Sequence, residues 1–174
     1  MATGPRYFVP FRRRKEGRTD YHARTKLVVS VAPRMVVRRT NRHVLCQLVR
    51  AEMVGDKTFA SAHSNELRKY GYTGSLSSTP AAYLTGMLFA VRCLNKGETN
   101  AILDIGLYRA SQGARVFAAL KGAVQTGMSI PHKEEILPSD ERCMGQHIAD
   151  YDDKMSDLPE NVKIVIDAIR KELN

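Results

Sequence analysis

The chain has 174 residues, of which 43% are hydrophobic and 26% are charged, and its formal net charge is +9. This length and composition are typical of one globular domain, alone or with an extension, and they argue against a disordered chain. The first fifty residues contain thirteen lysines and arginines and only two acids, whereas the remaining 124 contain fourteen basic residues and sixteen acids. The excess positive charge therefore lies at one end, a distribution typical of proteins that bind a polyanion.

The cysteines and the longest apolar run indicate the compartment. Cys46, Cys93 and Cys143 are odd in number and far apart, which argues against a disulfide framework and favours buried thiols in a reducing compartment. The longest apolar run after the basic cluster, residues 27–32, is interrupted by Ser30 and is much shorter than the roughly 20 residues of a membrane-spanning helix. We therefore expect a cytosolic protein with no membrane partner.

Residues 6–26 combine eight basic residues with four aromatic ones, Tyr7, Phe8, Phe11 and Tyr21. On charge alone, a solvated tail, a nuclear localisation signal, a membrane-binding segment and a nucleic-acid ligand all remain open. The run from Arg12 to Lys15 points in nearly every direction in a helix or a strand, so only an enclosing surface could contact all four side chains. Because aromatic rings can stack on bases, the segment favours nucleic acid.

The next segments predict a helix and three strands. Residues 19–31 fit a helix capped by Asp20, although residues 27–31 would also suit a strand. Residues 35–40 and 44–53 are rich in valine and leucine and read as antiparallel strands joined at Asn41 and Arg42. Gly55 and Asp56 mark a second turn into residues 58–62, which completes a three-stranded meander.

The second half alternates helices with one strand. Thr79 as cap, Pro80 and a terminating Gly97 bound a helix, and residues 101–105 read as a short buried strand. Further helices are expected over residues 113–126, from near Asp140, and over residues 159–173. The prediction is an α/β fold in which a mixed, largely antiparallel sheet packs against helices, with an extended basic N-terminal segment. We divide it into an N-terminal extension (1–26), a core (27–151), and a linker with a C-terminal amphipathic helix (152–174).

The sequence contains no recognisable catalytic, metal or cofactor motif. It lacks both the phosphate-binding loop that ends in Gly-Lys-Ser/Thr and the dinucleotide fingerprint. His132 and Glu134 match the first half of a zinc deaminase signature, but the second half, Pro-Cys-x-x-Cys, is missing. We therefore expect no enzyme activity, no metal, no cofactor and no small-molecule substrate.

An ordered set of short motifs runs through residues 4–150. The motifs are Gly4-Pro5-Arg6-Tyr7, Phe11-Arg12-Arg13-Arg14, Gly17-Arg18-Thr19-Asp20-Tyr21, Ala23-Arg24, Val36-Val37-Arg38, Thr40-Asn41-Arg42, Ser61-Ala62-His63, Glu66-Leu67, Tyr70-Gly71, Ala81-Ala82-Tyr83-Leu84-Thr85-Gly86, Leu103-Asp104-Ile105-Gly106-Leu107, Arg115-Val116-Phe117-Ala118-Ala119-Leu120-Lys121-Gly122 and Ile130-Pro131-His132. Together they resemble the large-subunit ribosomal protein family called L-eighteen in bacteria and L-five in eukaryotes, and the archaeal branch is the most similar.

This resemblance implies a structural protein of the cytoplasmic large ribosomal subunit that binds 5S rRNA and helps attach it to the large-subunit rRNA in the central protuberance. The implied partners are 5S rRNA, 23S-type rRNA and a neighbouring 5S-binding ribosomal protein. The implied RNA contacts are Tyr7, Arg12, Arg13, Arg14, Lys15, Arg18, Tyr21, Arg24 and Lys26, with Arg34, Arg38, Asn41 and Arg42 as a second group. The alternative is a free-standing RNA-binding or RNA-processing protein, such as a metal-dependent nuclease that uses Asp104, Glu134 and Asp150.

Overall fold

A four-stranded mixed sheet forms the centre of the computed structural model, which describes residues 4–173. The strands are β1 (Arg34–Arg39), β2 (Val44–Ala51), β3 (Asp56–His63) and β4 (Ile102–Asp104), in the spatial order β3-β2-β1-β4. The β1–β2 and β2–β3 pairs are antiparallel, whereas β4 pairs with β1 in parallel. The predicted fold class and the predicted meander are both confirmed.

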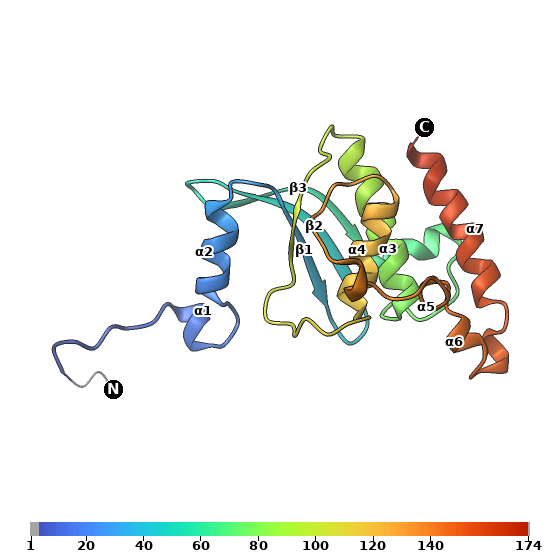
Figure 1. Cartoon of the computed structure of the whole chain (residues 1–174), viewed down its shortest axis with the longest axis horizontal. Helices are drawn as coiled ribbons and strands as arrows, with labels where there is room; N and C mark the ends of the chain where they lie inside the picture. The colour runs from blue at the N-terminus through green and yellow to red at the C-terminus, as the bar shows by residue number, and fades with distance from the viewer. Residues whose placement is uncertain (1–3, 174) are drawn as a thin grey trace.

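The α-helices lie before, between and after the strands (Figure 1). They are α1 (Arg12–Lys15), α2 (Tyr21–Val29), α3 (Thr79–Leu94), α4 (Arg115–Gln125), α5 (Asp140–Met144), α6 (Gln146–Ala149) and α7 (Leu158–Arg170). Four 3-10 segments accompany them: Ser64–Tyr70, Glu134–Ile136, Asp153–Met155 and Lys171–Leu173. Within the described residues, no helix has both the length and the apolar character needed to cross a membrane.

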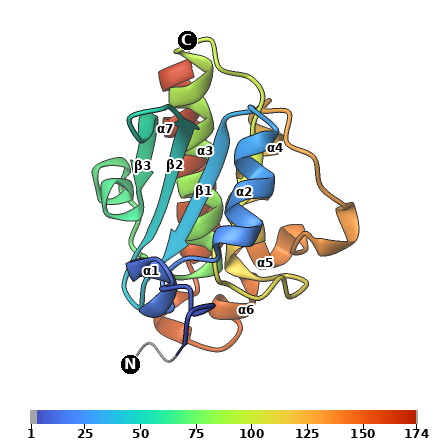
Figure 2. The same ribbon diagram turned by 90° about the vertical axis from the view of Figure 1, so that its left-hand side faces the viewer.

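The helices cover the two faces of the sheet very differently. Helices α3 and α4 pack on one face, and α7 packs on the side of α3 away from the sheet (Figure 1). On the opposite side of the sheet lie α2 and, below it in Figure 1, α1, and Figure 2 views the molecule from that side. Because α2 contains no buried residue, this outer face remains accessible from solvent at its margins.

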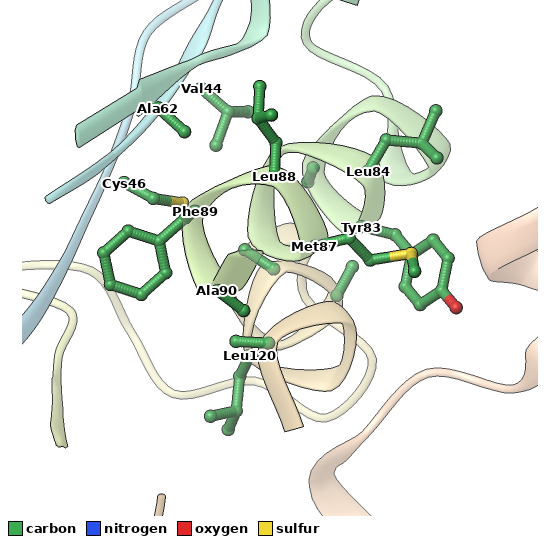
Figure 3. Packing of buried hydrophobic residues seen from close by; sticks show 14 of the residues in the cluster. Val44, Cys46, Ala62, Tyr83, Leu84, Met87, Leu88, Phe89, Ala90 and Leu120 are labelled. Atoms are coloured by element: carbon green, nitrogen blue, oxygen red, sulfur yellow. The ribbon is translucent and has the colours of Figure 1, made fainter. Parts of the chain in front are cut away.

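The hydrophobic core lies between the sheet and α3. The sheet contributes the strand residues whose side chains point toward α3. In return, Leu88 and Phe89 of α3 point toward Val44, Cys46 and Ala62 (Figure 3). Fourteen of the sixteen residues of α3 are buried, so this helix is enclosed by the sheet, α4 and α7 together. A helix that is apolar on all sides is typical of such a central position.

Two glycines allow α3 and α4 to approach closely. A Cβ atom at Gly86 would lie 2.0 Å from the carbonyl oxygen of Ala119, and one at Gly122 would lie 2.2 Å from that of Tyr83. Both distances are far below van der Waals contact, so each helix uses a glycine where the other backbone crosses it.

The outer edge of the sheet, along β3, is occupied by basic side chains. Arg92 donates a hydrogen bond to the carbonyl oxygen of Ser61 at 2.7 Å, and Lys96 donates one to that of Phe59. Arg92 also pairs with Glu66 at 2.6 Å. Burial alone would raise the pKa of Glu66, but the hydrogen bonds from Arg92 and from the His63 backbone outweigh it and lower that pKa.

Several local predictions are corrected by the structure. The side chain of Ser78, not that of Thr79, accepts the capping hydrogen bond of α3. Residues 101–105 form a strand of only three residues, and its one fully buried residue is the charged Asp104. The 3-10 segment Ser64–Tyr70 was not predicted, because its cap is the unusual residue His63. Residues 19–31 do form a helix, but it ends at Val29 rather than Val31.

Candidate nucleic-acid interface

The run of four basic residues forms a single helical turn, α1. Arg12, Arg13, Arg14 and Lys15 are all exposed, and none of them is buried against the body. Consecutive residues in one turn are spread around the helix axis. Four cations are therefore presented in different directions, as the sequence predicts.

Short polar contacts connect α1 to α2. The Arg13 Nε atom donates to the Thr19 hydroxyl at 2.9 Å, and the Asp20 carboxylate accepts from the backbone N–H groups of His22 and Ala23. Asp20 therefore caps α2, as the sequence predicts. This capping also places a carboxylate at the positive end of the helix, which stabilises it.

The aromatic residues of the N-terminal segment divide into two pairs. The rings of Phe11 and Tyr21 contact each other, with centroids 5.0 Å apart. Tyr7 and Phe8 are 49% and 77% exposed and leave their rings available for stacking. Exposed rings beside exposed cations are the combination that holds splayed bases in RNA-binding proteins.

Glu16 compensates little of the positive charge of this segment. Glu16 lies 3.7 Å from Arg12 and 3.2 Å from Arg18, and all three side chains are exposed. Such surface pairs contribute about 0–1 kcal/mol and exchange readily with another anion. Among the described residues, Arg14, Lys15 and Lys26 have no carboxylate within ion-pair distance.

An ion network holds α2 to the outer face of the sheet. Arg24 of α2 pairs with Asp56 of β3 at 3.0 Å, and Asp56 also pairs with Arg34 of β1 at 2.9 Å. Arg34 continues to Asp104 of β4 at 3.1 Å, and Asp104 pairs with Arg38 at 2.9 Å. Three arginines and two aspartates therefore link one helix to three strands and leave a net positive charge.

The network lines a groove of about 660 Å³ between α2 and the outer face of the sheet. Its basic lining comes from Arg13, Arg18, Arg24, Arg34 and Arg38, against three aspartates. Gly106 closes one side, and a Cβ atom there would lie 2.9 Å from the Arg38 guanidinium carbon. Because Gly106 has no side chain, the Arg38 guanidinium can lie against the backbone just after the end of β4.

The structure distributes the thirteen sequence-predicted contact residues over three environments. Tyr7, Arg12, Arg13, Arg14, Lys15, Arg18, Lys26, Asn41 and Arg42 are exposed, whereas Tyr21, Arg24 and Arg38 are half-buried. Asn41 and Arg42 lie in the β1–β2 turn, at the lower end of the sheet in Figure 1, the end at which α1 also lies. Arg34 is only 3% exposed and lies at the base of the groove between Asp56 and Asp104, so its guanidinium serves the ion network in this arrangement.

Sequence reasoning named Asp56 as a turn residue and Asp104 as an acid of the nuclease alternative, but it did not identify either as a partner of these arginines. Asp56 is the acid of a turn and Asp104 interrupts an apolar run, and neither signals an ion pair with β1 residues far away in sequence. It also left out Arg39, the last residue of β1, whose guanidinium carbon lies 5.5 Å from the centroid of the Tyr108 ring. The signal available for Arg39 was its position beside Arg38 at the end of a strand.

The residues considered for other chemistry do not converge. Within residues 4–173 there is no group of three or more histidine, cysteine or acidic side chains that could hold a metal ion. Asp104 is paired with two arginines, and Glu134 and Asp150 are exposed on separate short helical segments. The three thiols are free and buried, and burial raises the pKa of Cys93 to about 12 and that of Cys143 to about 11.

Comparison with known proteins shows which family the sequence matches. The family model described as ribosomal large subunit proteins 60S L5 and 50S L18 matches residues 5–102 and 95–133. The large ribosomal subunit protein uL18 of Methanospirillum hungatei is 67% identical over the whole of both chains, and that of Methanoregula boonei is 66% identical over 99% of both. That of Methanococcoides burtonii is 51% identical over 99% of this chain and 97% of its own.

The chain therefore belongs to the family of large-subunit ribosomal proteins that includes 60S L5 and 50S L18, and its similar relatives are archaeal uL18 proteins. It is a structural constituent of the cytoplasmic large ribosomal subunit and not an enzyme. The resemblance predicted from the motifs is confirmed. The relatives also match the last helix, which lies beyond the residues covered by those motifs.

Proposed function

We propose that the chain binds 5S rRNA and helps attach it to the 23S-type rRNA in the central protuberance, beside a neighbouring 5S-binding ribosomal protein. The observation that carries this proposal is the N-terminal segment, in which exposed cations without strong counter-ions alternate with exposed rings. The groove adds arginines from α1, α2 and β1 to this surface, and the β1–β2 turn exposes Arg42.

The physical chemistry of structured RNA fits this surface. The deep, narrow major groove of an A-form helix hides the base edges, so a protein holds such RNA mainly through phosphates, ribose hydroxyls and unstacked bases. Eleven of the thirteen basic residues in the first fifty are arginines. Arginine binds phosphate through two parallel hydrogen bonds, which gives orientation as well as attraction.

The test compares two variants that each lose four positive charges. One replaces Arg12, Arg13, Arg14 and Lys15 by glutamine, and the matched control replaces Arg68, Lys69, Lys163 and Arg170, which are exposed on the segment Ser64–Tyr70 and on α7. Filter binding to 5S rRNA is measured over a range of salt concentrations. Each lost phosphate contact flattens the plot of log affinity against log salt by about 0.7–0.9, so we expect a change of up to about 3 for the first variant and little for the control.

Equal losses in the two variants would mean that the segment contributes only general charge, which would contradict the proposal. A second measurement asks whether the wild-type protein sediments with large ribosomal subunits and remains there in moderate salt. Metal-dependent cleavage of RNA by the purified chain would favour the nuclease alternative instead.

A further inference from the structure

A second basic site lies at the end of the sheet where β1 and β4 both finish. It is a pocket of about 360 Å³ between the end of β1, the β4–α4 loop, the start of α4, and α5. Each of these elements contributes one arginine: Arg39, Arg109, Arg115 and Arg142, respectively. No aspartate or glutamate is among the lining residues. We call this feature the arginine pocket.

The charges of the arginine pocket are not compensated within the protein. None of its four arginines has a carboxylate within 4.0 Å among residues 4–173, whereas those of the groove described above pair with Asp56 and Asp104. Burial, together with the nearby charge of Arg39, lowers the pKa of Arg115. Repulsion between these cations therefore opposes the folded arrangement until an anion enters.

Two of the four arginines are nevertheless held in place by neutral groups. Arg39 lies over the Tyr108 ring, and its backbone N–H donates to the Tyr108 hydroxyl at 3.0 Å. Arg115 donates to the Ser77 carbonyl oxygen at 2.6 Å. A site whose cations are already oriented loses less conformational entropy when it binds an anion.

The start of α4 adds backbone donors to the same pocket. Its N-cap residue, Ala114, has no side chain that can accept a hydrogen bond, and the first turn contains no acid. Ala114 and Arg115 both line the pocket, so the unsatisfied N–H groups of the first turn belong to its wall. Helix N-termini favour anions through these groups and through the helix dipole.

We propose that the arginine pocket binds a phosphate group of an RNA backbone, at a contact point separate from the N-terminal segment. This inference rests on the proposed rRNA binding and adds a location to it. Planar guanidinium groups that surround a cavity of this size match a phosphodiester with its ribose. RNA is favoured over a free phosphate ion because Tyr108 lines both the arginine pocket and the groove described above, and the turn with Asn41 and Arg42 directly follows Arg39. The pocket thus continues the positive surface already described.

The test removes Arg109 and Arg142, whose side chains make no hydrogen bond or ion pair with residues 4–173. Arg109→Gln combined with Arg142→Gln removes two exposed charges, and Arg68→Gln combined with Arg170→Gln is the matched control at distant exposed positions. We expect the pocket variant to bind 5S rRNA about tenfold more weakly, with a salt slope reduced by about 1–2, and the control to bind as the wild type does. Equal thermal unfolding midpoints would show that both variants fold.

Three outcomes would overturn the inference in distinguishable ways. Wild-type protein that does not bind 5S rRNA would remove the proposed function and this inference with it. Unchanged affinity and salt slope of the pocket variant, with normal wild-type binding, would overturn the inference alone. If inorganic phosphate raises the unfolding midpoint of the wild type but not of the pocket variant, while RNA affinity is the same for both, the pocket binds a free ion rather than the RNA.

Discussion

Arg34 and Arg38 lie four residues apart on β1 and face the same side of the sheet, yet their side chains are 4% and 39% exposed. The difference arises because Arg34 lies between Asp56 and Asp104, whereas Arg38 meets Asp104 from the open end of β4. One guanidinium is therefore part of the internal structure and the other retains access to solvent. Residue type alone does not separate these roles, but the position of the acidic partners does.

Replacement of Arg34 by methionine should destabilise the protein. It leaves Asp104 buried with one partner fewer and breaks the connection between β4 and β3, so we expect a loss of about 3 kcal/mol in the free energy of unfolding, measured in urea. The control is Lys57→Met, which breaks the exposed pair with Glu52 and should cost at most about 1 kcal/mol. A variant as stable as the control would show that the network contributes no net stability.

At the scale of the elements, α3 and α4 form the tightest contact of the molecule. Each helix has a glycine where the backbone of the other passes, and both glycines are buried. In an isolated helix, alanine would be favoured over glycine by about 1 kcal/mol. The tight crossing reverses this preference, because a methyl group at either position would collide with a carbonyl oxygen.

Gly86→Ala should therefore lower the free energy of unfolding despite the better helix propensity. Separation of the two helices to accommodate the new Cβ atom should cost about 1–3 kcal/mol, read from a urea titration. Asp167→Ala, at an exposed position of α7, is the control and should stay within about 0.5 kcal/mol of the wild type. A stabilised Gly86→Ala protein would mean that α3 and α4 can separate at little cost.

Helices and strands that are marked by residues with strong local conformational preferences were predictable from the sequence. Pro80 and Gly97 bound α3 well because proline and glycine act through their own backbone, and the consecutive β-branched residues Val36 and Val37 of β1 favour a strand without help from neighbours. The cap of α3 was placed one residue too late, because Ser78 and Thr79 are equally suitable by type. Three of the four arginines of the pocket come from the β4–α4 loop, α4 and α5, and only tertiary packing brings them together with Arg39.

At the scale of the whole molecule, the two ends of the chain relate to the core in opposite ways. Residues 4–29 include no buried side chain, whereas α7 contributes Leu158, Val162, Val165, Ile166 and Ile169 to the core. These side chains cover the side of α3 that faces away from the sheet. The basic end can therefore change without loss of the fold, but the C-terminal helix cannot.

Two truncated chains test this asymmetry. A chain that lacks residues 1–18 should unfold cooperatively at nearly the wild-type midpoint, because none of the core side chains is removed. A chain that ends at Tyr151 loses the five buried residues of α7 and should fail to show a cooperative thermal transition. Both truncated chains are compared with the wild type by circular dichroism melting curves. A cooperative transition of the chain that ends at Tyr151 would contradict the prediction.

The hydrogen bonds from Arg92 and Lys96 to the edge of β3 limit the pairing of this edge with other chains before the protein is assembled into the ribosome. A free strand edge is a template on which another chain can add a strand, and exposed edges are common starting points of aggregation. Here the carbonyl oxygens of Ser61 and Phe59 already accept hydrogen bonds from cationic side chains, and the strand at the opposite edge is only three residues long. Newly made copies that await their RNA therefore offer one another few backbone groups for pairing, so that a pool of unassembled protein can stay dispersed.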